Sequence, residues 1–128
     1  MEKHELKEYL EEYMYDYQYL KAKINEIEKY DKMIGKNITS SSFSDNKEYE
    51  EQKMSKLMDK KREIESTIDL LKQPYRTVMY LKYICFSTFD QIADKLSYST
   101  KRIYQLHGEG LEQLSSILTD NEQNDNHN

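Results

Sequence analysis

The chain has 128 residues, of which 34% are charged and 37% hydrophobic, and its formal net charge is −5. Its 12 tyrosines and 3 phenylalanines supply more apolar surface than a disordered chain carries, whereas 1 proline and 3 glycines are too few for a turn-rich β fold. We therefore expect an all-α protein of one domain, or two small ones, with a modest core.

The cysteine content and the hydropathy pattern favour a cytoplasmic protein. Cys85 is the single cysteine, so an internal disulfide is excluded, and its apolar neighbours predict a buried thiol. The first residues are charged and lack the apolar core of a signal peptide, and no apolar run reaches the length of a membrane span. We expect no membrane partner.

Residues 1–36 are predicted to form a long coiled-coil helix. Their apolar positions alternate spacings of four and three residues, which is a heptad pattern. These positions are Leu6, Leu10, Tyr13, Tyr17, Leu20, Ile24 and Ile27. A lone helix has nothing against which to bury such a seam, so a second helix must cover it.

Residues 37–46 are rich in Ser, Thr and Asn, which compete for backbone hydrogen bonds, and are predicted to form a loop or hinge. A second long helix is predicted over 47–73. Its apolar face contains Met54, Leu57, Ile64, Ile68 and Leu71. Two arrangements satisfy the same heptads: an antiparallel hairpin within one chain, or a homodimer through the N-terminal helices.

Three short helices are predicted over 74–119. Pro74 suits the first turn of a helix, and Thr88 followed by Gln91 has the form of a capping box, which places the next helix over 89–96. Ser99 is predicted to cap the third helix. The inward-facing positions are Val78, Met79, Leu81, Tyr83, Ile92, Ala93, Leu96, Ile103, Leu106, Leu111 and Leu114. This spacing is typical of a helix-turn-helix DNA-binding domain.

The basic charge is local to the third short helix. Residues 1–73 hold 14 basic and 17 acidic side chains, and residues 74–119 hold 5 and 4. The polar segment 120–128 holds three acids and is predicted to be a disordered tail. The segment from Ser99 to His107 contains Lys101 and Arg102 and no acid, so it is the part of the chain best suited to double-stranded DNA.

The predicted exposed face of that helix offers base-reading groups. Gln105 can pair with an adenine edge, Lys101 can reach a guanine, and the methyl group of Thr100 can meet a thymine methyl. Tyr98, Ser99 and the amide groups at the helix start suit a phosphate. Arg102 can contact either a base or a phosphate. The remaining candidates for DNA contact are Tyr104 and His107.

The segments PYRTVMYLKY, FDQIADKLSYS and TKRIYQLHGEGLEQL resemble region 4 of the bacterial primary sigma factors, which reads the promoter −35 element. The matching positions are Ile92, Ala93, Leu96, Ser99, Arg102, Ile103 and Gln105. The chain departs from the pattern at Thr100, Lys101 and Tyr104, where the family carries Arg and Glu residues that read bases. The resemblance therefore implies the fold and a reading helix, but not an ordinary −35 preference.

The layout of the whole chain is similar to a narrower group, the small phage-encoded sigma-like regulators of the ArpU and RinA type. The specific part is the PYR lead-in and the string Tyr98, Ser99, Ile103, Leu106 and His107. This resemblance implies control of phage genes through the RNA polymerase of a bacterial host cell. Region 4 alone does not melt a promoter, so an activator is expected rather than a complete sigma factor.

An enzyme is not expected. None of His4, His107 and His127 pairs with a predicted nucleophile or a metal-ligand cluster, and no glycine-rich phosphate loop is present, so we expect no cofactor and no metal. The alternative function is a protein-interaction module that binds RNA polymerase, a sigma factor or a repressor without a DNA site of its own. The net negative charge favours that alternative.

Overall fold

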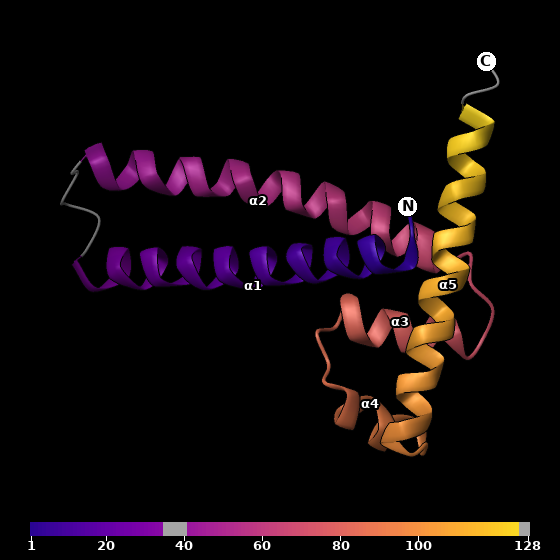
Figure 1. Ribbon diagram of the computed structural model, residues 1–128. Coiled ribbons are helices and arrows are strands. Elements are labelled where there is room, and N and C mark those ends of the chain that lie inside the picture. Colours follow the sequence, from indigo (N-terminus) through magenta and orange to yellow (C-terminus); the bar gives the residue numbers. More distant parts are fainter. Residues whose placement is uncertain (35–40, 126–128) are drawn as a thin grey trace.

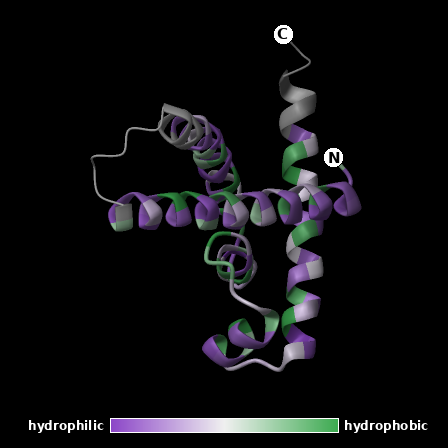
Figure 2. Cartoon of the chain, turned by 90° about the vertical axis from the view of Figure 1, so that its left-hand side faces the viewer, coloured by the Kyte–Doolittle hydropathy of each residue, from purple (hydrophilic) through white to green (hydrophobic). Residues whose placement is uncertain are grey.

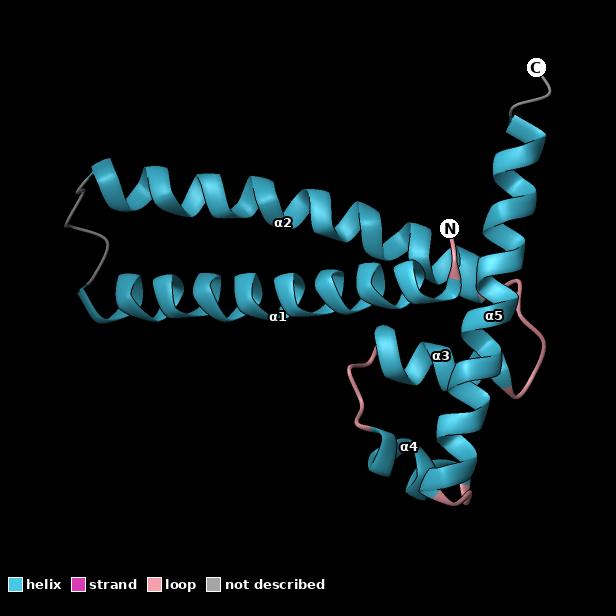
Figure 3. Ribbon diagram, viewed as in Figure 1, coloured by secondary structure: helices cyan, strands magenta, loops and turns pink. Residues whose placement is uncertain are grey.

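The computed structural model describes residues 1–34 and 41–125, and within these ranges the chain is all-helical, as predicted (Figure 1). From residue 41 onward, short loops and turns join the described helices (Figure 3). The helices are α1 (Lys3–Ile34), α2 (Ser41–Ile68), α3 (Tyr75–Tyr83), α4 (Phe89–Leu96) and α5 (Thr100–Asp125).

The two long helices, α1 and α2, lie side by side and run in opposite directions (Figure 1). The heptad seam of α1 is buried over its first half, at Leu6, Leu10, Tyr13, Tyr17 and Leu20. The first four of these residues share one hydrophobic cluster with Ile64 and Ile68 of α2 and with Leu71, which follows it. Within this chain, α2 therefore covers the seam that the sequence left without an assigned partner.

Three predicted boundaries differ from the structure. Helix α2 begins at Ser41 rather than at residue 47, whereas residues 37–40 of the predicted loop lie outside the described residues. The same helix ends at Ile68 rather than at residue 73, because the chain turns before Pro74. Helix α5 continues to Asp125, through most of the segment predicted as a tail, and 126–128 lie outside the described residues. Polar residues extend an existing helix at small cost, since nucleation is the expensive step.

The predicted buried thiol is also wrong. Cys85 is exposed, because it follows the end of α3 where the chain reverses. The next residue, Phe86, has a φ of 60° and packs its ring against Tyr17, with 5.5 Å between the ring centroids. Phe86, rather than the thiol of Cys85, therefore packs against the apolar residues that the sequence suggested would bury the cysteine.

Helix α5 passes through both hydrophobic clusters of the molecule. Its first turns place Ile103 and Leu106 in a cluster with α3 and α4, and its middle places Leu111 and Leu114 in the cluster with α1 and α2. Figure 2 shows α1 crossing α5, with α3 below α1 and α4 near the start of α5. The crossing is tied by an ion pair of 3.3 Å between Lys3 and Glu112.

Gly110 allows α5 to approach α3 closely. A Cβ atom at this buried position would lie 3.0 Å from Cγ and 3.1 Å from Sδ of Met79. At Gly108 a Cβ atom would lie 3.4 Å from Nζ of Lys3, which is the mobile end of a long side chain. Of these two glycines, only Gly110 is therefore required by packing.

We predict that Gly108→Ala raises the free energy of unfolding by roughly 0.5–1 kcal/mol, because alanine favours a helix over glycine by about that amount. Gly110→Ala is expected to raise the free energy of unfolding by less, or to lower it, since Met79 must shift. Urea denaturation of both variants measures the difference. Equal stabilisation by the two substitutions would contradict the close packing at Gly110.

Candidate nucleic-acid interface

Helix α4 begins at a complete capping box, as the sequence predicted. The hydroxyl of Thr88 accepts a hydrogen bond of 3.1 Å from the backbone N–H of Gln91, and the side-chain oxygen of Gln91 accepts one of 2.9 Å from the backbone N–H of Thr88. The two bonds satisfy amide groups that the first turn leaves without partners. They fix the direction in which α4 leaves the preceding loop.

The turn between α4 and α5 is short. Ser97 takes the left-handed conformation, with φ 59° and ψ 40°, and ends α4. The hydroxyl of Ser99 then accepts a hydrogen bond of 3.1 Å from the backbone N–H of Arg102, which confirms Ser99 as the cap of α5. The hydroxyl of Thr100 donates to a carboxylate oxygen of Asp90 at 3.0 Å. This bond joins the first turn of α5 to the first turn of α4.

Most of the predicted DNA-contacting side chains lie together on the exposed side of this turn and of the first turns of α5. They are Tyr98, Ser99, Lys101, Arg102, Tyr104 and Gln105. Lys101 and Gln105 are four residues apart and therefore neighbours on one face of the helix. The guanidinium of Arg102 donates a hydrogen bond of 3.3 Å to the side-chain oxygen of Gln105. Thr100 is only partly exposed, and its hydroxyl is engaged by Asp90.

His107 does not belong to this surface, which corrects the prediction. Its side chain is buried, at 5% exposure, and Nε2 lies 2.6 Å from the hydroxyl of Tyr83. The spacing of the inward-facing residues contains the missed signal, because His107 stands four residues after Ile103 and four before Leu111. A residue at that interval lies on the buried face of the helix.

Phe89 and Lys82, which the sequence analysis did not single out, are partly exposed and lie next to this surface. The ring of Tyr104 packs on that of Phe89, with centroids 4.4 Å apart, and Nζ of Lys82 lies 4.3 Å from the centroid of Phe89. Tyr104, Phe89 and Lys82 come from α5, α4 and α3 respectively. No sequence pattern reports this contact, because it depends on how the three helices pack.

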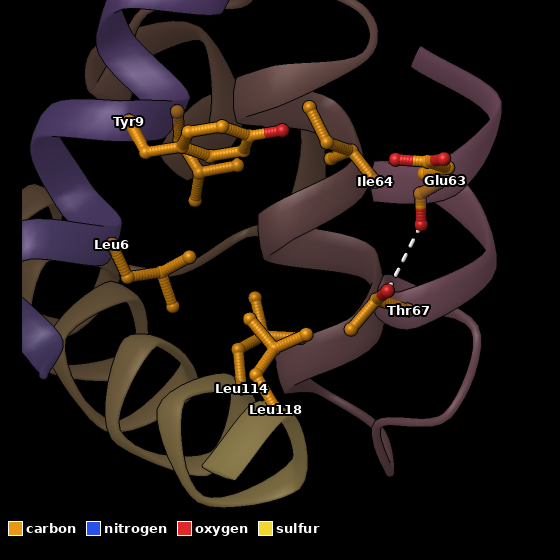
Figure 4. Close-up of a pocket in the computed structure, with 8 residues that line it drawn as sticks. Leu6, Tyr9, Glu63, Ile64, Thr67, Leu114 and Leu118 are labelled. Atoms are coloured by element: carbon orange, nitrogen blue, oxygen red, sulfur yellow. Dashed lines mark hydrogen bonds between the residues drawn. The ribbon is translucent and has the colours of Figure 1, made fainter. Parts of the chain in front are cut away.

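A hollow of about 130 Å³ lies where α1, α2 and α5 meet (Figure 4). Its lining is mostly apolar and consists of Leu6, Tyr9, Leu10, Glu63, Ile64, Thr67, Leu114 and Leu118. The hydroxyl of Thr67 is used within α2, where it donates to the carbonyl of Glu63 at 2.9 Å. The hollow is smaller than the roughly 300–1,000 Å³ of typical ligand sites, so it is best described as a gap in core packing.

A second, wider groove of about 390 Å³ lies between α1 and α2 away from α5. Asp16 and Glu50 both line it, and the carboxylate of Glu50 is buried and lies 2.8 Å from Nζ of Lys23. The hydrogen bond between them lowers the pKa of Glu50 and raises that of Lys23. The groove is thus crossed by an ion pair that ties the two long helices together.

Within residues 1–34 and 41–125, no group of three or more His, Cys, Asp and Glu side chains is arranged to hold a metal ion. Over the same part of the chain, no helix has the length and apolar character that crossing a bilayer requires. The polar surface at the start of α5, where Lys101, Arg102 and Gln105 are exposed together, is the candidate site that the geometry supports best.

The buried His107 predicts an acid-sensitive fold. Burial, with Lys7, Lys82 and Lys3 nearby, lowers the pKa of His107 from 6.5 to about 4. In the unfolded chain His107 is protonated as the pH falls through about 6.5, whereas in the folded protein it is protonated only near pH 4. The free energy of unfolding therefore falls as the pH is lowered between these two values. The complete loss in the free energy of unfolding is about 3 kcal/mol, because each unit of pKa shift corresponds to about 1.36 kcal/mol.

Urea denaturation across this pH range measures the loss, and His107→Gln is the control, because glutamine can still bond to Tyr83 without titrating. The variant is expected to show a flatter profile than the unsubstituted protein, whatever its absolute stability. Parallel profiles for the two proteins would contradict this assignment.

Comparison with protein families gives one match, which covers residues 42–115 and thus more than half of the chain. The matching model is described as a protein of unknown function, DUF1492. Comparison with curated proteins and with solved structures found no significant match. The matched segment begins in α2 and includes α3, α4 and the exposed first turns of α5. The chain belongs to the DUF1492 family.

Proposed function

We propose that the protein is a sequence-specific DNA-binding transcription regulator in which α3, α4 and α5 act as a helix-turn-helix. The observation that carries this proposal is the cluster of Lys101, Arg102 and Gln105 on the exposed first turns of α5. The segment from Ser99 to His107 contains no acidic side chain, so nothing within it repels a phosphate backbone. Helix α4 and the turn hold these residues in a fixed position.

In this proposal the start of α5 enters the major groove. Gln105 pairs with an adenine and Lys101 reaches a guanine, while the bond from Arg102 holds the amide of Gln105 in one orientation. Tyr98, Ser99 and the N-terminus of α5 lie against a phosphate, as anions favour that end of a helix dipole. Thr100 contributes through its methyl group, because its hydroxyl is already bonded to Asp90.

The proposed regulator is an activator of the phage type that acts with bacterial RNA polymerase. The hairpin of α1 and α2 supplies a surface for a protein partner, since Tyr15 and Tyr19 stand 64% and 68% exposed one turn apart on α1. A second copy of the chain can also use this surface. A dimer would double the phosphate contacts of the small basic region.

We predict that Lys101→Ala with Gln105→Ala abolishes sequence preference and weakens binding by roughly 1–3 kcal/mol for each base that is no longer read. Genomic DNA fragments recovered by the purified protein at two salt concentrations supply the sites, and fluorescence anisotropy on those sites measures affinity. The matched control is Gln52→Ala with Lys56→Ala, an exposed pair with the same spacing on α2. Unchanged preference in the α5 variant would refute the proposal.

The second candidate is a protein-interaction module without a DNA site. The net charge of −5 and the exposed tyrosines of α1 favour it. Such a protein would recover genomic fragments uniformly or not at all, and it would be captured by RNA polymerase, a sigma factor or a repressor. A few sharp genomic sites that fade as salt rises would eliminate this candidate.

A further inference from the structure

Phe89 is the first residue of α4, and its ring is held by side chains of two other helices. On α5, the centroid of the Tyr104 ring lies 4.4 Å from that of Phe89, and the His107 ring meets Phe89 edge-on with 5.0 Å between centroids. On α3, Nζ of Lys82 lies 4.3 Å from the centroid of Phe89. Because His107 is buried and Lys82 is partly buried, these contacts fix the position of the Phe89 ring.

Tyr104 packs on this fixed ring but is itself exposed. The residue is 56% exposed, and its hydroxyl has no hydrogen-bond partner among the described residues. Thr100, one turn earlier on the same side of α5, bonds to Asp90, the residue that follows Phe89. Two successive turns of α5 are therefore attached to the first two residues of α4. A side chain held in this way loses little conformational freedom when a ligand binds to it.

Tyr104 lies at the edge of the proposed reading face, on the side of α4. Successive residues of an α-helix are about 100° apart, so Tyr104 stands about 60° around the helix axis from Lys101 and about 100° from Gln105. Arg102 lies on the other side of the same two residues. In a helix-turn-helix the first helix crosses the sugar-phosphate backbone, while the second lies in the major groove. With α4 as the first helix, Tyr104 faces the backbone when Lys101 and Gln105 face the bases.

We propose that the hydroxyl of Tyr104 donates a hydrogen bond to a phosphate oxygen of the DNA strand nearest α4, and that Phe89 is the positioning residue for this contact. This inference rests on the proposed function and deepens it, because it assigns Tyr104 to the backbone rather than to a base. A cation here would be partly neutralised by the nearby carboxylate of Asp90, whereas a neutral hydroxyl remains a donor. Tyr104 thus adds affinity without sequence information, and Lys101 and Gln105 supply the preference.

The first test is Tyr104→Phe in the full chain, which keeps the stacked ring and removes only the hydroxyl. Fluorescence anisotropy measures affinity for duplexes that carry the recovered genomic sites and for mixed-sequence duplexes. Because a hydrogen bond to a charged group is lost, binding to both kinds of duplex is expected to weaken about tenfold. Base preference is expected to stay unchanged, and so is the slope of log affinity against log salt, since no cation is removed.

The second test is Phe89→Leu, which keeps an apolar side chain and removes the stacked ring. It is expected to weaken binding several-fold in the chain that retains Tyr104, and to have no further effect in the Tyr104→Phe chain, where no hydroxyl remains to be positioned. Phe89→Tyr, which keeps the ring, is expected to bind like the unsubstituted protein. Equal losses from Phe89→Leu in both chains would assign Phe89 a structural role only and would overturn its positioning role.

Tyr49→Phe is the matched control, since Tyr49 on α2 is also 56% exposed and loses the same hydroxyl. Thermal unfolding shows whether the Phe89→Leu variant folds, and Tyr104→Phe tests the phosphate contact without it. Affinity that Tyr104→Phe leaves unchanged, or that Tyr49→Phe lowers equally, overturns the inference, and so does a change in base preference. The proposed function then stands if Lys101→Ala with Gln105→Ala still weakens binding. Failure of the unsubstituted protein to bind DNA overturns both.

Discussion

The burial of one helix in two hydrophobic clusters is the constraint on which this molecule depends. Helix α5 packs Ile103 and Leu106 against α3 and α4, and a few residues later it packs Leu111 and Leu114 against α1 and α2. Because the helix is continuous between these contacts, the pair α1 and α2 cannot move independently of α3 and α4 without breaking a cluster. The exposed first turns of α5 are therefore held in a fixed orientation relative to α1 and α2.

The polar centre of this arrangement is the pair formed by Tyr83 and His107. Both side chains are buried, and each supplies the hydrogen-bond partner that the other needs. Burial is the main cause that keeps the imidazole neutral, and the charges of Lys7, Lys82 and Lys3 act in the same direction. The histidine thus stabilises packing between α3 and α5 and leaves the exposed face of α5 to other residues.

The features that the sequence predicted well are local ones. The start of α4 follows from Thr88 and Gln91, which are three residues apart, and the cap at Ser99 follows from the residues next to it. The early start of α2 was missed because serine and asparagine are only slightly unfavourable in a helix. The contacts of Lys82 and Phe89, and the approach of Lys3 to Gly108, could not be predicted, since they depend on how distant helices dock.

The contact between the start of α1 and the middle of α5 has a consequence for biosynthesis. Lys3 pairs with Glu112, and the hydroxyl of Ser115 donates a hydrogen bond to the carbonyl of Met1, so residues 1–3 are tied to α5, which is synthesised after α1 to α4. During translation α1 and α2 emerge first and can associate, but the cluster that they share lacks Leu111 and Leu114 until α5 is made. Until α5 is made, part of the apolar surface of α1 and α2 is therefore exposed, and transiently exposed apolar surface of this kind favours aggregation.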